Sequence, residues 1–317
     1  MVHRIDPILA TILGIHLWWY GLSYTLGLLN AHLFVGRHRH RLGLSRRQSY
    51  DFSLFLAAGV LLGGRTLSVA IDWPFYQDNL RLIPAVWIGG FATHGLIVGG
   101  AIGVLAFCLI HARPFREMFD ALAIPAAVIL GLGRLGNFID GQIIGAVTTL
   151  PWGIQFPEAE GFRHPVVLYD GLKNLAIVPV LIWVRSLGVP PGRLAVLFLV
   201  MYSGLRIPID VLREYRNQFL GLGAGQTNNI LMLSIGLALL AVNWWRWRHG
   251  RPAERTVVAD DDGQATGLGW RRLVLGGLLL GALVIPSDAP RDVPDLYGDR
   301  HPGLAHSVAY PPVDVDW

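Results

Sequence analysis

Arginine, asparagine and aspartate side chains recur at helical spacing inside apolar stretches of this 317-residue chain. Arg206, Asp210 and Arg213 are separated by four and then three residues, so one face of a helix would carry all three. Arg134 and Asn137 are three residues apart and would share a face of another helix. Guanidinium groups bind phosphate through paired hydrogen bonds, and phosphate is the anion that a lipid bilayer offers. The sequence therefore predicts a site for a phospholipid headgroup.

Two further polar residues lie at the ends of neighbouring apolar stretches. Arg65 lies near the end of one stretch and His94 at the beginning of the next. An imidazole exchanges a proton near neutral pH, so beside a phosphate-binding arginine cluster His94 is a candidate general base. Arg65 is a candidate third phosphate ligand. The alternative is a network of salt bridges between helices that binds no ligand.

The elements that would position these residues are membrane-spanning helices. The chain is 53% hydrophobic and 15% charged, whereas soluble domains carry about 25% charged residues. A spanning helix needs about 20 mainly apolar residues. The sequence predicts an all-α, polytopic membrane helix bundle with eight such stretches, at residues 11–35, 49–70, 92–111, 117–138, 165–185, 193–212, 226–246 and 269–286.

Lysine and arginine counts predict the orientation of these spans. With the N-terminus outside, the inner segments hold 15 basic residues and the outer segments seven. This is the bias that bacterial membrane proteins show, so both termini are predicted to be outside. In this orientation the polar residues of six helices, which run in alternating directions, all lie near the outer face. The net charge of +4 is then a topology signal, and no nucleic-acid partner is expected.

The remaining segments and the cysteine content set further limits. Residues 251–268 contain an aspartate run and are predicted to be a cytoplasmic linker. Residues 287–317 are rich in proline and aspartate and are predicted to be an extended or disordered extracytoplasmic tail. Cys108 is the only cysteine, so the chain can form neither an internal disulfide nor a cysteine metal cluster.

The polar motifs also carry a family resemblance. The run Gly133-Arg-Leu-Gly-Asn-Phe-Ile-Asp-Gly-Gln-Ile-Ile-Gly145 resembles the signature of the bacterial prolipoprotein diacylglyceryl transferases. That signature reads Gly-Arg-(Ile/Leu)-Gly-Asn-Phe-(Ile/Val)-Asn-Gly-Glu, followed shortly by Gly-Arg. Other segments resemble the family in the same order, namely Trp19-Tyr20-Gly21, Gly63-Gly64-Arg65, His94-Gly95-Leu96, Asp120, Arg163-His164-Pro165, Leu168-Tyr169, Arg206 with Asp210 and Arg213, and Gly225-Gln226.

The resemblance implies a fold, a reaction and a set of site residues. The fold would have seven family-like spans within a domain of residues 1–250, with residues 269–286 as an additional span. The reaction would transfer a diacylglyceryl group from phosphatidylglycerol to the thiol of a lipobox cysteine in a prolipoprotein, in the bacterial cytoplasmic (inner) membrane, without metal or organic cofactor. The implied catalytic residues are His94, Arg134, Asn137, Arg206 and Asp210, and the implied substrate-binding residues are Tyr20, Arg65, Gly136, Gly145, Arg163, Tyr169 and Arg213.

The chain departs from the family pattern at several positions. Gln142 replaces a glutamate, Asp140 an asparagine and Ala146 an arginine. The changes at Gln142 and Ala146 remove one negative and one positive charge, as the joint loss of an ion pair would. Asp170 and Asp210 replace glutamates, and Val166-Val167 replace Ser-Gln. These changes keep two alternatives open: a diverged lipid transferase with another acceptor, and a non-catalytic lipid-binding membrane protein.

Overall fold

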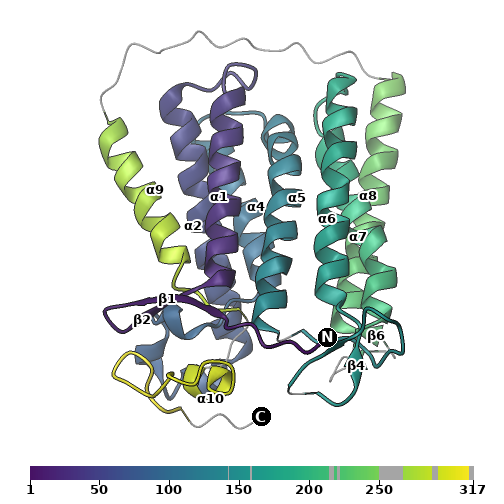
Figure 1. Ribbon diagram of the computed structural model, residues 1–317. Coiled ribbons are helices and arrows are strands. Elements are labelled where there is room, and N and C mark those ends of the chain that lie inside the picture. The colour runs from purple at the N-terminus through teal and green to yellow at the C-terminus, as the bar shows by residue number, and fades with distance from the viewer. Residues whose placement is uncertain are drawn as a thin grey trace.

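A computed structural model of the protein describes residues 1–141, 143–157, 159–213, 218–219, 222–249, 267–287 and 292–313. Eight long helices stand side by side (Figure 1). They are α1 (Trp19–His38), α2 (Arg46–Ile71), α4 (Thr93–Ile110), α5 (Phe115–Asp140), α6 (Val166–Ser186), α7 (Arg193–Val211), α8 (Ala224–His249) and α9 (Leu268–Ala282). Within the described residues, α2 and α4 to α8 are the six that are long and apolar enough to cross a membrane. The predicted polytopic helix bundle is therefore confirmed.

The first predicted span begins too early. Residues before Trp19 form an antiparallel hairpin of β1 (Ile8–Ile12) and β2 (Ile15–Trp18). Leu13 and Gly14 both have positive φ angles, which is the backbone geometry that a tight hairpin turn requires. The apolar residues of this stretch thus form a strand pair that precedes α1.

The predicted eighth span is a shorter helix than expected. The helix α9 has 15 residues, which gives a length of about 22 Å at 1.5 Å per residue. A bilayer core is about 30 Å thick. Because of this length, α9 is not among the six helices that could cross a membrane.

The helices α2 and α4 pack backbone against backbone. Glycines line the contact, and a Cβ atom added to Gly99 would lie 2.1 Å from the carbonyl oxygen of Gly59. A Cβ added to Gly95 would lie 2.3 Å from the carbonyl oxygen of Gly63. Small residues allow this close approach in membrane helices, and the contact holds the beginning of α4, where His94 lies, against α2.

The helix α5 lies between the other helices and sets their positions. It packs against α1 on one side and against α6 and α7 on the other. Asp120 of α5 accepts hydrogen bonds from the backbone N–H groups of Gly192 (2.6 Å) and Ala195 (2.8 Å) at the beginning of α7. This carboxylate satisfies backbone donors that the first turn of a helix leaves unpaired, and it fixes α7 against α5.

Short elements gather at the end of the bundle that holds the N-terminus (Figure 1). They are α3 (Trp73–Tyr76), the 3₁₀ turns Leu80–Leu82 and Val86–Ile88, β3 (Ile154–Gln155) with β4 (Phe162–Arg163), β5 (Gln218–Phe219) with β6 (Leu222–Gly223), and α10 (Val293–Tyr297). Residues 251–266 of the predicted linker lie outside the described residues. Its last two residues are Gly267, which precedes α9, and Leu268, which is the first residue of α9.

The prediction of an extended or disordered tail is wrong for residues 292–313. The side chains of Tyr297 and Tyr310 are each 1% exposed, and both belong to one core cluster with Trp18 and Tyr76. Asp292 caps α10 by accepting a hydrogen bond from the backbone N–H of Asp295. A few aromatic anchors and one cap therefore order a segment whose composition is mainly proline and aspartate.

Candidate functional site

One buried carboxylate joins three helices at the centre of the candidate site. Asp170 of α6 accepts a hydrogen bond from Nε of Arg134, on α5, at 2.6 Å and another from Nη1 of Arg206, on α7, at the same Oδ2 atom. The Nζ atom of Lys173 lies 2.9 Å from the other carboxylate oxygen. Three cations thus share one counterion. Removing a partner from a buried ion pair typically costs about 3–5 kcal/mol, so this carboxylate holds α5, α6 and α7 together.

A second carboxylate extends the cluster to α8. Oδ2 of Asp210 lies 3.4 Å from Nε of Arg206, one helical turn away. The same oxygen accepts a hydrogen bond from Nδ2 of Asn229 at 2.6 Å. The predicted pairing of Arg206 with Asp210 is present, and polar side chains from four consecutive helices, α5 to α8, meet at one level of the bundle.

Asn137 connects Arg134 to another part of the chain. Its Oδ1 atom accepts a hydrogen bond from Nη1 of Arg134 at 3.1 Å. Its Nδ2 atom donates a 2.6 Å hydrogen bond to Oγ of Ser287. The amide is therefore oriented on both sides, with its oxygen toward the arginine.

The cluster surrounds a small pocket that is rich in arginine. Arg134, Arg206 and Arg213 line it together with Asp170 and Asp210. Among the described residues, Lys173 beside Asp170 brings the cations at this level to four, with two carboxylates. Ionisable groups at membrane depth are expensive to bury and usually mark a functional site. The guanidinium groups that line the pocket make it suitable for an anionic group.

His94 lies at the beginning of α4, on the side that faces α8. Its side chain is exposed, and its Nε2 atom lies 2.9 Å from Nδ2 of Asn228. An amide nitrogen can only donate, so Nε2 is the accepting nitrogen of the imidazole. Arg206 and Arg134 are both close enough to His94 to interact with it electrostatically. The structure thus brings the predicted base to the arginine cluster.

Arg65 does not have the partners that the sequence prediction assigned to it. Its five N–H donors go to backbone carbonyl oxygens of the segment between α2 and α4, including those of Ile83 at 2.7 Å and Gly90 at 3.2 Å. Its guanidinium also lies over the ring of Tyr76, 5.2 Å from the centroid. With every donor engaged, the side chain organises residues 82–90 and has none left for a phosphate.

Replacing Arg65 with methionine is therefore expected to lower stability more than substrate affinity. The variant would leave several buried carbonyl oxygens without donors, at a cost of about 3 kcal/mol after partial relaxation. Thermal unfolding in detergent should show a lowered Tm, while the folded fraction keeps its KM for phospholipid. A raised KM at an unchanged Tm would return Arg65 to the binding site.

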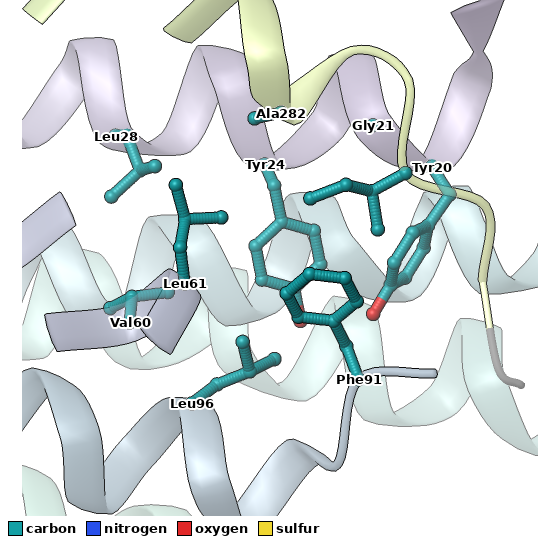
Figure 2. Close-up of a pocket in the computed structure, with 10 residues that line it drawn as sticks. Tyr20, Gly21, Tyr24, Leu28, Val60, Leu61, Phe91, Leu96 and Ala282 are labelled. Carbon is teal, nitrogen blue, oxygen red and sulfur yellow. The ribbon is translucent and has the colours of Figure 1, made fainter. Parts of the chain in front are cut away.

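The remaining predicted substrate-binding residues fall into two groups. Tyr20 lies in an apolar pocket of about 330 Å³, where its ring packs beside Tyr24 and Phe91 under the end of α9 (Figure 2). Gly136 belongs to the contact beneath it, because a Cβ added there would lie 2.8 Å from Cα of Tyr20. This glycine lets α5 approach α1 closely.

The second group lies at the end of the bundle that holds the short strands. Gly145 forms an isolated bridge with Arg213. Arg163 donates from Nε to the carbonyl oxygen of Glu160 at 2.8 Å, and Tyr169 accepts a 2.7 Å hydrogen bond from Nε1 of Trp152. These residues lie around the beginning of α6 and the end of α7. Gln142 lies outside the described residues. Its replacement of a glutamate was interpreted together with the replacement of an arginine by Ala146.

Two residues of the cluster were not expected in it. Lys173 follows Asp170 by three residues, so helical spacing indicates only that the two could pair along one helix. Such spacing carries no signal that arginines of other helices share the same carboxylate. Ser287 follows the last apolar stretch, and no motif surrounds it. Only the folding of the C-terminal segment onto α5 brings it to Asn137.

Comparison with known proteins decides the family. The family model described as prolipoprotein diacylglyceryl transferase matches residues 7–242. The chain belongs to this family. A diacylglyceryl transferase from Nitrosomonas europaea, named phosphatidylglycerol–prolipoprotein diacylglyceryl transferase, is 34% identical over 266 residues, covering 80% of this chain and 94% of that protein. A relative with the same name from Brucella canis is 32% identical over 267 residues, covering 80% of this chain and 95% of the relative.

Membership in the diacylglyceryl transferase family agrees with the geometry. The matched region includes α1 to α7 and most of α8, which together carry the whole arginine cluster and His94. Residues beyond 242, including α9, Ser287 and α10, lie outside the match.

Proposed function

We propose that this protein transfers a diacylglyceryl group from phosphatidylglycerol to the lipobox cysteine thiol of prolipoproteins. The products are a thioether-linked lipid and glycerol phosphate. The observation that carries the proposal is the pocket between α5, α6 and α7 of this member of the family. In it, Arg134 and Arg206 both donate to the carboxylate of Asp170. The guanidinium groups that line this pocket match a phosphodiester headgroup.

The arginines would hold the phosphate. Among the described residues, the hydrogen bonds and ion pairs of Arg134 and Arg206 run through Nε and Nη1 of each side chain. The Nη2 groups are then the donors for the phosphate oxygens. Asp170 and Asp210 keep the two guanidiniums fixed before the substrate arrives, and such preorganised charge is what stabilises a leaving group as its charge develops. Arg213, which lines the same pocket, would add to this field.

His94 would accept the proton of the substrate thiol. The thiolate is the nucleophile, and it attacks the glyceryl carbon that carries the phosphate ester. The new C–S bond forms as the C–O bond breaks, and the electron pair of that bond leaves with the phosphate oxygen of glycerol phosphate. His94 is exposed, so an acceptor cysteine that enters beside α4 and α8 can replace the Asn228 amide at Nε2, the nitrogen that would take the proton. Tyr20 and Tyr169 would position the headgroup.

The reaction would take place at the outer side of the bacterial cytoplasmic membrane. Helices α4 to α7 alternate in direction, and the α4–α5 and α6–α7 connections lie at the end opposite the N-terminus (Figure 1). The arginines in or beside these two connections are Arg113, Arg116, Arg185 and Arg193. The bias toward basic residues on the cytoplasmic side then supports an N-terminus outside the cell membrane, with residues 292–313 and the pocket on the same side.

A mass measurement tests this function. The purified protein, reconstituted in vesicles containing phosphatidylglycerol, should add one diacylglyceryl group to a synthetic lipobox peptide and release glycerol phosphate in equal amount. A peptide with serine in place of the cysteine and vesicles lacking phosphatidylglycerol are the controls. A folded protein that modifies no lipobox peptide would favour the second candidate, a related lipid transferase with another acceptor, for which Gln142 and Ala146 are the motivating departures.

A further inference from the structure

The segment beyond the family match contributes a buried side chain to the site. Ser287 is 1% exposed and follows α9. Its Oγ atom accepts the 2.6 Å hydrogen bond from Nδ2 of Asn137, and its backbone N–H donates to Oδ2 of Asp140 at 2.9 Å. A residue 150 positions along the chain from Asn137 thus completes the hydrogen bonding of the signature motif.

The end of α9 is held against α1 at the level of the site. The backbone N–H of Trp18 donates to the carbonyl oxygen of Leu283 at 2.9 Å, and Oγ1 of Thr25 donates to that of Leu279 at the same distance. A Cβ added to Gly21 would lie 2.4 Å from the carbonyl oxygen of Ala282. These backbone contacts leave Ser287 little freedom to move away from Asn137.

Asp140 anchors the rest of the tail to the end of α5. Its carboxyl group interacts with the side chains of Ser287, Tyr297 and Arg300. Nη1 of Arg300 also donates to the Asp140 carbonyl oxygen. Gly141 ends the helix with a φ of 70°, and a Cβ there would lie 2.2 Å from Arg300 Nη1. The aspartate that departs from the family asparagine is thus the residue on which the additional segment converges.

The bonds of Asn137 connect this anchor to the phosphate pocket. Arg134 can only donate, so it requires the amide oxygen of Asn137. The Ser287 hydroxyl also forms a hydrogen bond with the Asp140 carboxyl, which takes the hydroxyl proton, so Ser287 acts as an acceptor toward the amide nitrogen of Asn137. Without the serine hydroxyl, the amide loses one of the two contacts that fix it, and Arg134 loses a rigidly held partner for its guanidinium.

We propose that Ser287 is a positioning residue for the transfer reaction, acting through Asn137 on Arg134, and that residues 268–287 are a working part of the site. This inference rests on the proposed function, because the pocket it tunes is the one that would bind phosphatidylglycerol. It extends that function to a segment that the family match does not include.

The first measurement compares Ser287→Ala with Ser307→Ala, which removes an exposed serine hydroxyl whose hydrogen bond, from the backbone N–H of Tyr310, lies away from Asn137. Loss of one oriented hydrogen bond should lower kcat about threefold to tenfold, with KM for phosphatidylglycerol unchanged and Tm close to that of the wild type. The Ser307→Ala protein should behave as the wild type in all three respects.

A binding measurement separates this inference from the proposed function. Glycerol phosphate carries the charge that develops as the ester breaks, and calorimetry should show it binding about threefold to tenfold more weakly to Ser287→Ala than to wild type. An unchanged affinity in the folded variant overturns the positioning role. The other outcome is that Ser287→Ala binds glycerol phosphate more weakly although the wild-type protein modifies no lipobox peptide. This result supports the positioning role of Ser287 and refutes the lipobox cysteine as the acceptor.

A second variant keeps the test valid if Ser287→Ala does not fold. Asp140→Asn retains an oxygen for the Ser287 N–H but removes the carboxyl group that interacts with Tyr297 and Arg300. It should release the tail, seen as faster proteolysis after residue 287, and lower the affinity for glycerol phosphate by a similar factor. A released tail with wild-type affinity contradicts the proposal.

Discussion

Replacing Arg206 with alanine is expected to reduce kcat/KM for diacylglyceryl transfer by about a thousandfold. The guanidinium lines the pocket, donates to Asp170 and lies 3.4 Å from Asp210. Its loss removes a fixed positive group where the leaving phosphate gains charge. It also leaves two buried carboxylates with one cation fewer. Mass analysis of a lipobox peptide, at saturating and at limiting phosphatidylglycerol, measures the effect on each kinetic constant.

A buried arginine elsewhere in the bundle provides the control. Arg271 pairs with Asp51 through Nε at 2.6 Å and Nη2 at 3.1 Å. The two residues lie near the beginnings of α9 and α2. Arg271→Met should lower Tm, as loss of any buried pair does, while each folded molecule keeps its activity. Arg206→Lys keeps the charge but loses the forked geometry, and should recover only part of the activity. Equal losses in Arg206→Ala and Arg271→Met would reduce Arg206 to a structural role.

Replacing His94 with alanine is expected to reduce kcat about a hundredfold at neutral pH. The physical reason is that the acceptor thiol, with an ordinary pKa of about 8.5, is mostly protonated at that pH. The deficit should shrink as the pH rises through this value, because the thiol then ionises without a base. A pH profile of kcat for the variant and the wild type measures this convergence.

The matched control for His94 lies at the other end of the same helix. His111 follows the last residue of α4 and lies 3.6 Å from Asp51. His111→Ala should leave the pH profile of kcat unchanged. A loss in His94→Ala that is constant across the pH range would mean that the imidazole supports the site without taking the proton.

Sequence alone predicted most of the bundle, because the bilayer imposes a length on every apolar segment that crosses it. The stretches expected at 92–111 and 193–212 agree closely with α4 (Thr93–Ile110) and α7 (Arg193–Val211). The same rule failed for residues 11–18, where a turn at Leu13-Gly14 makes an apolar stretch reverse direction. Hydropathy measures composition, and it cannot distinguish an apolar hairpin from the beginning of a helix.

The site was predicted where helical spacing fixes which side chains share a face. Arg206 with Asp210, and Arg134 with Asn137, were expected as pairs and are present as pairs. Arg65 has the same residue type and a similar position at a helix end, but its partners are carbonyl oxygens of an irregular segment. Every residue has a backbone carbonyl oxygen, so the sequence does not show which of them an arginine will contact. The position of Arg65 in the sequence therefore could not distinguish a phosphate ligand from a structural arginine.

The tail was mispredicted for a different reason. Composition averages over a segment, whereas the packing of residues 292–313 depends on a few isolated side chains such as Tyr297 and Tyr310. Their partners lie far away in the sequence, and the backbone N–H of His16 donates to the Tyr310 hydroxyl at 3.0 Å. Contacts of that separation are visible only once the chain is folded.

The glycine contact between α2 and α4 has a consequence for how this protein can tolerate change. Because main chain meets main chain at Gly59 and Gly99, the height and tilt of α4, which begins beside His94, depend little on apolar side chains that point away from this contact. Lipid-facing residues such as Val98 and Ile102, which are 56% and 60% exposed, are thus free to drift during evolution as membranes of different composition are encountered. The imidazole keeps its place through such drift, because its support is built from atoms that substitution elsewhere does not alter.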